Sequence, residues 1–505
     1  MNRRLVVLWD PENPLIRVRS LIAALKERVD VIDVTFRESS HRTLPNDAFE
    51  LLQCLGSQEI DGLLWVEGGP LPRDLESFEA PKAAWLLNDH AEPTLIDDLR
   101  GRFDRQLVSL LRHSAEPNSG WMPPCAEDSN PAMGISIFTD DPAPPAQVAL
   151  DIAIREALES LPVPKTPVHF SLGHAGRVHS RLFDSLRSGA AVVVDSETDL
   201  RGIAHAGDHL EVLPQNGHLR EFVQDLIRDE TRLARLASRG PEIVSHLHSP
   251  SVRAADLCDA LWPRREILGG KDFRPVVSLL VTCHRFRRRL RFCLESLARQ
   301  ELPQGVLEVV VADPESPDGL AEYLREFAES SPHLRVVRLP LDARYCRNRG
   351  YSIDRAFEAS SGDVVIGIDG DIVFSPHLVG QLADSVLVSP GNVFGVRRVF
   401  LDRSTTELIL AGSGDPFRDF ERLSLADGDG QENSFVGVLG YCQATTRAAF
   451  AKARYPREFD MVNQSDIVFV ERLEKEAGVK PRFLGEAKVL HLWHPRNWAG
   501  TSELL

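Results

Sequence analysis

Short apolar runs alternate with amphipathic segments from the start of the chain. Leu5–Trp9, Val29–Phe36, Gly62–Val66 and Ala83–Leu87 have the length and composition of buried strands, whereas Ile16–Arg28 has its apolar residues at helical spacing. Strands that alternate with helices are typical of parallel α/β sheets. The pattern therefore predicts a Rossmann-like subdomain over residues 1–130.

A second α/β set follows a stretch at 118–146 that is rich in proline, glycine and small polar residues. Such a stretch predicts a crossover between two halves. The expected strands of the second set are Val168–Leu172 and Ala190–Asp195, and its expected helices cover Ser180–Arg187, 219–237 and 251–261. We assign it to a second Rossmann-type subdomain over residues 131–266.

The pattern starts afresh after a glycine-containing segment at 268–274, which we interpret as a linker. Pro275–Thr282 and Leu307–Ala312 are expected strands, and Leu290–Arg299 is an expected helix. They open a third α/β domain over residues 275–505. At roughly 150 residues per domain, a chain of 505 residues has room for about three such units.

Composition and charge restrict the class of protein. Hydrophobic residues make up 43% and charged residues 26% of the chain, as in soluble globular proteins. The net charge of −16 argues against nonspecific binding to nucleic acid or to an anionic membrane, so we expect no nucleic-acid partner. The local basic run Arg285–Arg291 is either solvated helix charge or a contact for an anionic acceptor or a lipid phosphate, so peripheral membrane contact stays open.

The expected location is cytoplasmic, with association at the inner membrane face as an alternative. The longest apolar stretches fall far short of the roughly 20 residues of a membrane span. The N-terminal apolar run stops at Asp10 without a small-residue cleavage site, which indicates a first strand and not a signal peptide. The seven cysteines include no C-x-x-C pair, which favours a reducing compartment over a disulfide framework.

The most specific chemical signal is the segment Val364–Val373, in which a buried strand leads into Asp369, Gly370 and Asp371. Ligands of open α/β sheets bind at the carboxyl ends of the strands, where these acids are expected. Carboxylates at that edge suit Mg²⁺ or Mn²⁺ bridging a diphosphate. The alternative is an Asp-Gly turn with solvated acids.

Three features in this order resemble family 2 glycosyltransferases of the GT-A fold: the acid Asp313 after the second strand, the A-R-N-x-G-like segment around Arg347 and Asn348, and D-x-D. The resemblance covers Pro275 to about His494. It implies that Asp313 contacts the uridine base or ribose, and that Asp369 and Asp371 serve ribose and metal. Arg347 and Asn348 would orient the diphosphate or, equally, brace the loop.

Further along, Phe459–Leu473 resembles the G-F-D…E-D-x-D/E…R-L segment of galactosyl- and N-acetylgalactosaminyl-type transferases. The resemblance implies that Asp466, at the start of an expected helix, is the general base that takes the proton from the acceptor hydroxyl. Ser465 stands where those relatives often carry glutamate, which suggests a different acceptor. The alternative role for Asp466 is that of a helix N-cap.

Near the end of the given sequence, His491-Leu492-Trp493-His494 follow an apolar strand. Relatives with H-x-W-H or H-x-H here use a histidine to complete the coordination of the metal, which implies His491 as a ligand beside Asp371, with His494 as the second choice. Imidazole ligands favour Mn²⁺ over Mg²⁺. A buried structural histidine is the alternative for either residue.

The segment 174–195 is similar to the carboxyl-terminal half of GT-B glycosyltransferases of the spore-maturation type. Its R-L-F-D-S-L-R-S-G pattern puts Asp184 where those proteins carry glutamate, and Gly202 stands near the position of their later acid. The resemblance implies a GT-B-like Rossmann pair in the N-terminal half. A degenerate module that positions an acceptor or partner is favoured there over a second active site.

Together these features predict a metal-dependent glycosyltransferase that moves a hexose or N-acetylhexosamine from a UDP-sugar to a hydroxyl of a glycan, glycolipid or glycoprotein. An inverting displacement with Asp466 as base is favoured. The alternatives are a retaining transferase and a noncatalytic glycan-binding or scaffold protein. A nucleotidyltransferase is disfavoured because no glycine- and lysine-bearing phosphate loop follows the strand at Val276.

Overall fold

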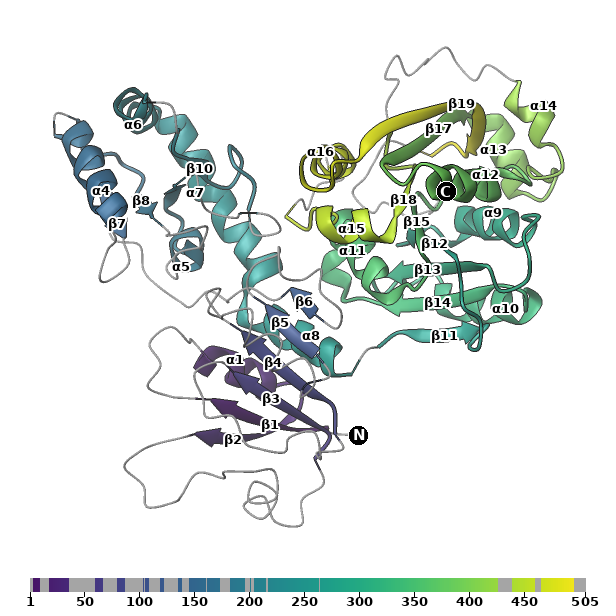
Figure 1. Cartoon of the computed structure of the whole chain (residues 1–505), viewed down its shortest axis with the longest axis horizontal. Helices are drawn as coiled ribbons and strands as arrows, with labels where there is room; N and C mark the ends of the chain where they lie inside the picture. Colours follow the sequence, from purple (N-terminus) through teal and green to yellow (C-terminus); the bar gives the residue numbers. More distant parts are fainter. Residues whose placement is uncertain are drawn as a thin grey trace. The chain divides into compact units, whose positions relative to one another are not determined.

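A computed structural model shows two compact units, residues 1–263 and 264–505 (Figure 1). The structure describes residues 3–9, 18–35, 60–66, 80–86, 103, 105–108, 119–121, 135–138, 145–159, 161–172, 182–195, 200, 204–214, 217–262, 264–425, 438–458 and 465–494. The predicted α/β class is confirmed in both units. The division of the N-terminal unit into two separate domains stays a prediction.

The first sheet of the N-terminal unit is parallel, with strand order β2-β1-β3-β4-β5-β6. The strands are β1 (Arg4–Trp9), β2 (Asp30–Thr35), β3 (Gly62–Val66), β4 (Lys82–Leu86), β5 (Arg105–Val108) and β6 (Ser119–Trp121). Helix α1 (Val18–Lys26) and the distant helix α8 (Pro250–Leu261) pack in one core with β1, β3 and β4. The strands of this sheet that the sequence predicts are therefore present.

The second sheet of this unit is also parallel, with order β10-β9-β8-β7. Its strands are β7 (Ile135–Phe138), β8 (Val168–Ser171), β9 (Ala191–Val194) and β10 (Glu211–Val212), and its helices are α4 (Pro145–Leu158), α5 (Leu182–Arg187), α6 (Leu219–Arg228) and α7 (Glu230–Ile243). A π-helix (Val244–His248) joins α7 to α8. The helical stretch predicted over 219–237 is divided at Asp229, because its side chain accepts a hydrogen bond from Arg232 N and caps α7.

The C-terminal unit contains a mixed sheet with order β11-β14-β13-β12-β15-β18-β17-β19-β16. Its strands are β11 (Glu266–Gly269), β12 (Val277–Thr282), β13 (Leu307–Asp313), β14 (Arg335–Pro340), β15 (Val364–Ile368), β16 (Ile372–Phe374), β17 (Asn392–Phe400), β18 (Cys442–Thr446) and β19 (Lys480–His491). Strands β14, β13, β12 and β15 are parallel, so their carboxyl ends lie at one edge. Leu268 and Gly269, which the sequence analysis assigns to a linker, lie in β11, because that segment adds an antiparallel strand to β14.

Helices cover both faces of this sheet (Figure 1). They are α9 (Arg287–Ala298), α10 (Leu320–Ser330), α11 (Arg349–Ala359), α12 (Leu378–Val388), α13 (Arg403–Leu410), α14 (Phe420–Ser424), α15 (Arg447–Ala453) and α16 (Ser465–Ala477), with a 3-10 turn at Ala343–Tyr345. One core joins α9, α10 and α12 to the strand face that carries Leu279 and Ile366. The other face is covered by α11 and α15, whose Phe357 and Phe450 rings stack with centroids 4.3 Å apart.

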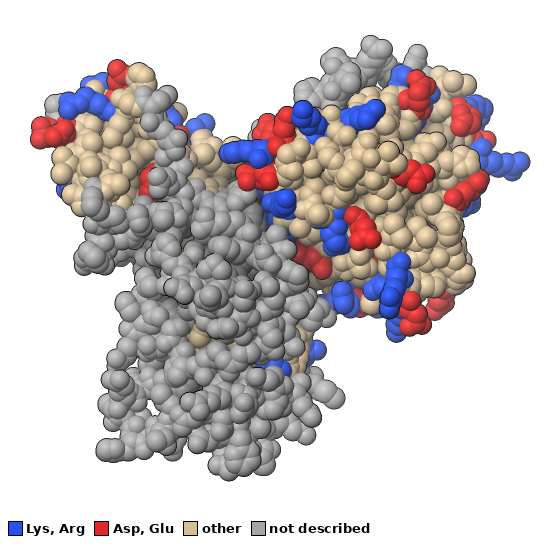
Figure 2. Space-filling view, in the orientation of Figure 1, with Lys and Arg blue, Asp and Glu red and all other residues tan. Residues whose placement is uncertain are grey.

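Acidic and basic side chains are interspersed over the face of the C-terminal unit that Figure 2 displays. None of the described helices combines the length and the apolar character that a membrane crossing needs. The cellular location stays a prediction.

Helix α11 approaches the segment 454–458 so closely that one position excludes a side chain. A Cβ atom built on Gly350 would lie 1.8 Å from the carbonyl oxygen of Pro456. At the same place Asn348 Nδ2 donates a hydrogen bond to the carbonyl oxygen of Arg457 at 2.8 Å. The backbone of this segment is thus seated directly on the first turn of α11.

We expect Gly350→Ala to destabilise the C-terminal unit by about 1–3 kcal/mol, because the added methyl group forces α11 and the segment apart. Urea unfolding with a far-UV circular dichroism readout measures the change. Gly391→Ala is the matched control, since a Cβ there meets nothing within 4 Å. Equal midpoints for the two variants would contradict the close approach.

Candidate functional site

The D-x-D acids lie in the short connection between β15 and β16, at the carboxyl edge of the parallel strands. Strand β16 pairs antiparallel with the end of β19, so that Ile372 lies opposite His491. Leu492 N also donates a hydrogen bond to the carbonyl oxygen of Asp371 at 2.9 Å. Backbone pairing therefore places the C-terminal histidines beside the second acid of D-x-D.

The structure brings together the three predicted metal ligands. Asp371 Oδ2 lies 3.4 Å from His491 Nε2 and 3.2 Å from His494 Nε2. One ligand atom from each residue falls within 4.8 Å of the others. Two ligands of one octahedral cation at about 2.1 Å are roughly 3 Å apart when they are adjacent, so this spacing suits a shared ion.

The chemistry of the cluster also fits a metal. Within the described residues, the buried atoms Asp371 Oδ1 and His491 Nδ1 have no hydrogen-bond partner. Burial lowers the pKa of His491 although Asp371 acts against the shift, so the imidazole is held neutral, as a metal ligand must be. A carboxylate with two imidazoles suits Mn²⁺ better than Mg²⁺, which prefers oxygen ligands alone.

Packing around the histidine segment holds it in place. The ring of Phe286 meets His494 edge-on, with centroids 5.6 Å apart. Arg289 Nε donates to the carbonyl oxygen of Trp493 at 3.0 Å, and Trp493 N donates to Thr406 Oγ1 at 2.9 Å. Part of the basic run at 285–291 therefore has a structural role, because the side chain of Arg289 is buried beneath this segment.

Asp466 lies in the first turn of α16 and is half-buried. Its Oδ2 atom accepts a hydrogen bond from Gly440 N at 2.8 Å, and its Oδ1 atom accepts one from Ile467 N at 3.0 Å. The helix already includes Ser465, so Asp466 is inside the helix and the N-cap alternative does not describe it. Its role as general base stays a prediction.

Arg349 is a site residue that the sequence analysis missed. Its side chain is 10% exposed and donates to Asp369 Oδ1, at 3.2 Å from Nε and 3.1 Å from Nη2. Nη2 also donates to the carbonyl oxygen of Gly440 at 2.6 Å. One guanidinium thus joins the first acid of D-x-D to the loop that holds Asp466. The available signal was an arginine directly after an Asn cap in the A-R-N-x-G-like segment.

Asp313 and Asn348 are largely committed to internal contacts. Asp313 is 1% exposed, with Oδ1 accepting from Ser316 N at 2.8 Å and Oδ2 pairing with Arg338 Nη2 at 2.7 Å. Asn348 caps α11, since its Oδ1 accepts from Tyr351 N at 2.8 Å. This is the loop-bracing role that the sequence analysis left open. Arg347 is exposed. The roles of these three residues toward a donor stay predictions.

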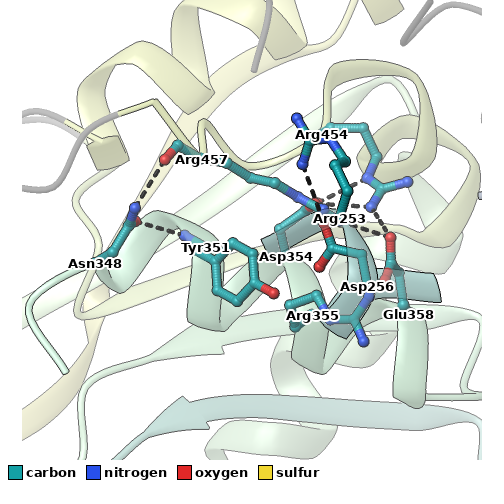
Figure 3. A network of polar contacts seen from close by, with 9 residues as sticks. All are labelled: Arg253, Asp256, Asn348, Tyr351, Asp354, Arg355, Glu358, Arg454 and Arg457. Carbon is teal, nitrogen blue, oxygen red and sulfur yellow. Dashed lines mark hydrogen bonds and ion pairs between the residues drawn. The ribbon is translucent and has the colours of Figure 1, made fainter. Parts of the chain in front are cut away.

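Further along α11, the helix that begins at Arg349, Asp354 and Glu358 form a cluster of ion pairs with arginines. Figure 3 shows this cluster. Asp354 accepts two hydrogen bonds of 2.7 Å from Arg454 and a further one from Arg457. Glu358 accepts from Arg454 at 2.5 Å, from Arg457 at 2.6 Å and from Arg355 at 2.8 Å. These contacts tie α11 to the segment 454–458, whose Tyr455 accepts a hydrogen bond from Arg349.

Some predicted features fall outside the described residues. These are Phe459–Gln464, the first part of the G-F-D-like segment, the C-terminal residues from Pro495 to Leu505, and most of the loop before α5. In the N-terminal unit, Asp184 lies on α5 and is buried. Whether it contacts a ligand stays a prediction.

Two parts of the chain match family models. Residues 278–429 match the model described as "Glycosyl transferase family 2", and residues 160–259 match the model described as "Glycosyl transferase-like". The C-terminal unit therefore contains a family 2 glycosyltransferase domain, and a glycosyltransferase-like segment precedes it in the chain. The resemblance of the C-terminal half to family 2 glycosyltransferases and the glycosyltransferase-like resemblance of the N-terminal half are confirmed. The similarity of Phe459–Leu473 to galactosyl- and N-acetylgalactosaminyl-type transferases stays a prediction.

Individual proteins give more limited similarities. A glycosyltransferase named AglE from Haloferax volcanii is 30% identical over 105 residues, which are 20% of this chain and 32% of that protein. The match thus spans about a third of the length of the relative. A mannosyltransferase from Pyrobaculum calidifontis, solved with GDP-Man and Mn²⁺, is 17% identical, with a TM-score of 0.33 over 46% of this chain and 60% of that chain. Residues 1–349 of TarS from S. aureus, solved with UDP-GlcNAc, are 14% identical, with a TM-score of 0.33 over 45% and 61%.

The ion-pair cluster makes the stability of the C-terminal unit depend on pH. Burial alone would raise the pKa of Glu358, but Arg457, Arg355 and Arg454 lower it well below its usual range. Such a carboxyl adds stability above its unfolded pKa of about 4.3 and loses it as the pH falls through the folded value. We expect the free energy of unfolding to fall steadily below about pH 4.5, and Glu358→Gln to flatten that slope.

Urea unfolding between pH 3 and pH 7 measures the slope. Glu407→Gln is the control, because Glu407 forms an exposed pair with Arg403 one helical turn away. If the stability of the Glu358→Gln variant falls with pH as steeply as that of the Glu407→Gln variant, a group other than Glu358 causes the pH dependence.

Proposed function

We propose, from the family 2 glycosyltransferase domain in the C-terminal unit, that this protein is a divalent-metal-dependent glycosyltransferase that uses a UDP-hexose or UDP-N-acetylhexosamine. The observation that carries the proposal is the convergence of Asp371, His491 and His494 at the carboxyl edge of the sheet. The acceptor would be a hydroxyl of a glycan, glycolipid or glycoprotein.

The donor side of the site would be formed by D-x-D and the histidine segment. Asp371, His491 and His494 would hold the cation, and Mn²⁺ bound there would offset negative charge on the departing nucleoside diphosphate. Asp369 is 26% exposed and points its Oδ1 atom at Arg349, so its other oxygen has room to accept a hydrogen bond from a ribose hydroxyl. Burial of Asp371 and His491 keeps water from competing for the same ligands.

On the acceptor side, Asp466 would act as the general base. The acceptor oxygen attacks the anomeric carbon and forms the new glycosidic bond, while the bond from that carbon to the diphosphate oxygen breaks. The electron pair leaves with the nucleoside diphosphate, and the acceptor proton passes to the Asp466 carboxylate. A single displacement of this kind inverts the anomeric configuration.

The N-terminal unit would position an acceptor or a partner. Its match to a glycosyltransferase-like model supports a common origin with transferase modules. Asp184 is 7% exposed, and its place on α5 corresponds to the glutamate of the resembling family. We propose that this unit is a degenerate module, with catalysis confined to the C-terminal unit.

A donor screen tests the function. The EDTA-treated protein is incubated with UDP-glucose, UDP-galactose, UDP-N-acetylglucosamine, UDP-N-acetylgalactosamine or GDP-mannose, with and without Mn²⁺, and nucleoside diphosphate release is measured. We expect no turnover in the EDTA-treated protein without metal, and turnover with one UDP-sugar when Mn²⁺ is added. Asp371→Asn is expected to lower kcat/KM by at least about a hundredfold, because it removes the carboxylate ligand of the cation.

Asp384→Asn, an exposed position on α12, is the matched control. Full activity without metal would contradict the metal site, and turnover with GDP-mannose alone would contradict the UDP assignment. The absence of metal-dependent release with every donor would favour a noncatalytic glycan-binding or scaffold protein. NMR of the product separates inversion, which we expect, from retention.

A further inference from the structure

Asp466 belongs to a closed ring of hydrogen bonds. The residues of this ring come from four separate stretches of the chain. Arg349 donates to the Tyr455 hydroxyl, which donates to Gln443 Oε1 at 3.0 Å. Gln443 Nε2 donates to the carbonyl oxygen of Asp466 at 3.0 Å. Gly440 N donates to Asp466 Oδ2 at 2.8 Å, and the carbonyl oxygen of Gly440 accepts from Arg349 at 2.6 Å. We call Arg349, Tyr455, Gln443, Asp466 and Gly440 the positioning ring.

The donors and acceptors of the ring are matched in direction. Burial raises the pKa of Tyr455, so its hydroxyl keeps the proton that it donates to Gln443. Burial alone would lower the pKa of Arg349, but Tyr455, Asp369 and Asp466 raise it, so the guanidinium stays charged. Each of these groups has the protonation state that its bonds require. Because hydrogen bonds in a buried network support one another, the ring is expected to be stiffer than separate bonds would be.

Steric contact makes the ring tighter still. A Cβ atom on Gly440 would lie 2.8 Å from Asp466 Cβ and 2.9 Å from its Oδ2. Only glycine therefore allows the loop backbone to reach the carboxylate. The loop therefore holds the carboxylate through Gly440 N, while Gln443 holds the main-chain carbonyl of the same residue.

Arg349 also connects the ring to the donor side. Its Nε and Nη2 atoms contact Asp369 Oδ1, two residues before the proposed metal ligand Asp371. The rest of α11 is anchored by the ion pairs of Asp354 and Glu358, so Arg349 projects from a fixed helix. Movement of Asp466 relative to D-x-D would therefore have to break at least one bond of this chain of contacts.

We propose that Arg349, Tyr455 and Gln443 are positioning residues that fix the Asp466 carboxylate relative to the donor acids. The inference rests on the proposed function, in which Asp466 is the base. A base displaced by about 1 Å can lose as much as two orders of magnitude in rate. Tyr455 and Gln443 thus act on the transfer step and not on the affinity for the nucleotide, whereas Arg349 also contacts Asp369 on the donor side.

Tyr455→Phe tests the ring by removing one hydroxyl that lies away from the proposed metal ligands. With the sugar nucleotide that the wild type uses, kcat is expected to fall roughly five- to tenfold with the donor KM unchanged. Isothermal titration with UDP and Mn²⁺ is expected to give the wild-type affinity. Tyr323→Phe removes a buried hydroxyl that has no hydrogen-bond partner among the described residues, and it is expected to keep the wild-type kcat.

A double-mutant cycle separates the ring from general loss of stability. Gln443→Leu breaks the same ring, so the double variant Tyr455→Phe/Gln443→Leu should lose little more kcat than the worse single variant. Two results would overturn the ring in a wild type that turns over. One is that the kcat losses of the two single variants multiply in the double variant. The other is that Tyr455→Phe has the same kcat as Tyr323→Phe. A wild type without turnover would overturn the proposed function, and the inference with it. A parallel loss of UDP affinity would show a structural role and also contradict it.

Discussion

The antiparallel pairing of β16 with the end of β19 is the contact on which the proposed metal site depends. Asp371 and His491 are far apart in the chain, and only this pairing sets Ile372 opposite His491. The bond from Leu492 N to the carbonyl oxygen of Asp371 extends the pairing by one residue. Without it, Asp371 and the two histidines that would share a cation with it would lie on unrelated segments.

Buried charge is the second constraint on this unit. Isolated buried ions are costly, but Asp354, Glu358 and their arginine partners satisfy one another through short hydrogen bonds. The cluster fixes α11 against the segment 454–458, and Gly350 allows the two backbones to touch. The same helix begins at Arg349, so the stability of the cluster and the geometry of the proposed acceptor side depend on one element.

Two sides of the site are therefore held by different means. Backbone pairing and the packing of Phe286 and Arg289 hold the donor side, whereas side-chain hydrogen bonds hold Asp466. Side-chain bonds are easier to rearrange than a strand pair, because they involve fewer backbone groups. The acceptor side is thus the part of the site whose geometry responds most directly to single substitutions.

The sequence by itself determined the α/β class, most strands, D-x-D, the histidine segment and the glycosyltransferase resemblances of the two halves. These features can be read from the sequence because apolar periodicity and local motifs depend on residues that are close together in the chain. It could not identify Arg349, Tyr455 or Gly440 as neighbours of Asp466, since their contacts cross from one segment to another. Nor could it show that Asp313 is buried against Arg338, or that the supposed linker supplies β11. Only the tertiary structure decided these points, because the pairing of a side chain depends on what the fold brings within about 3 Å of it.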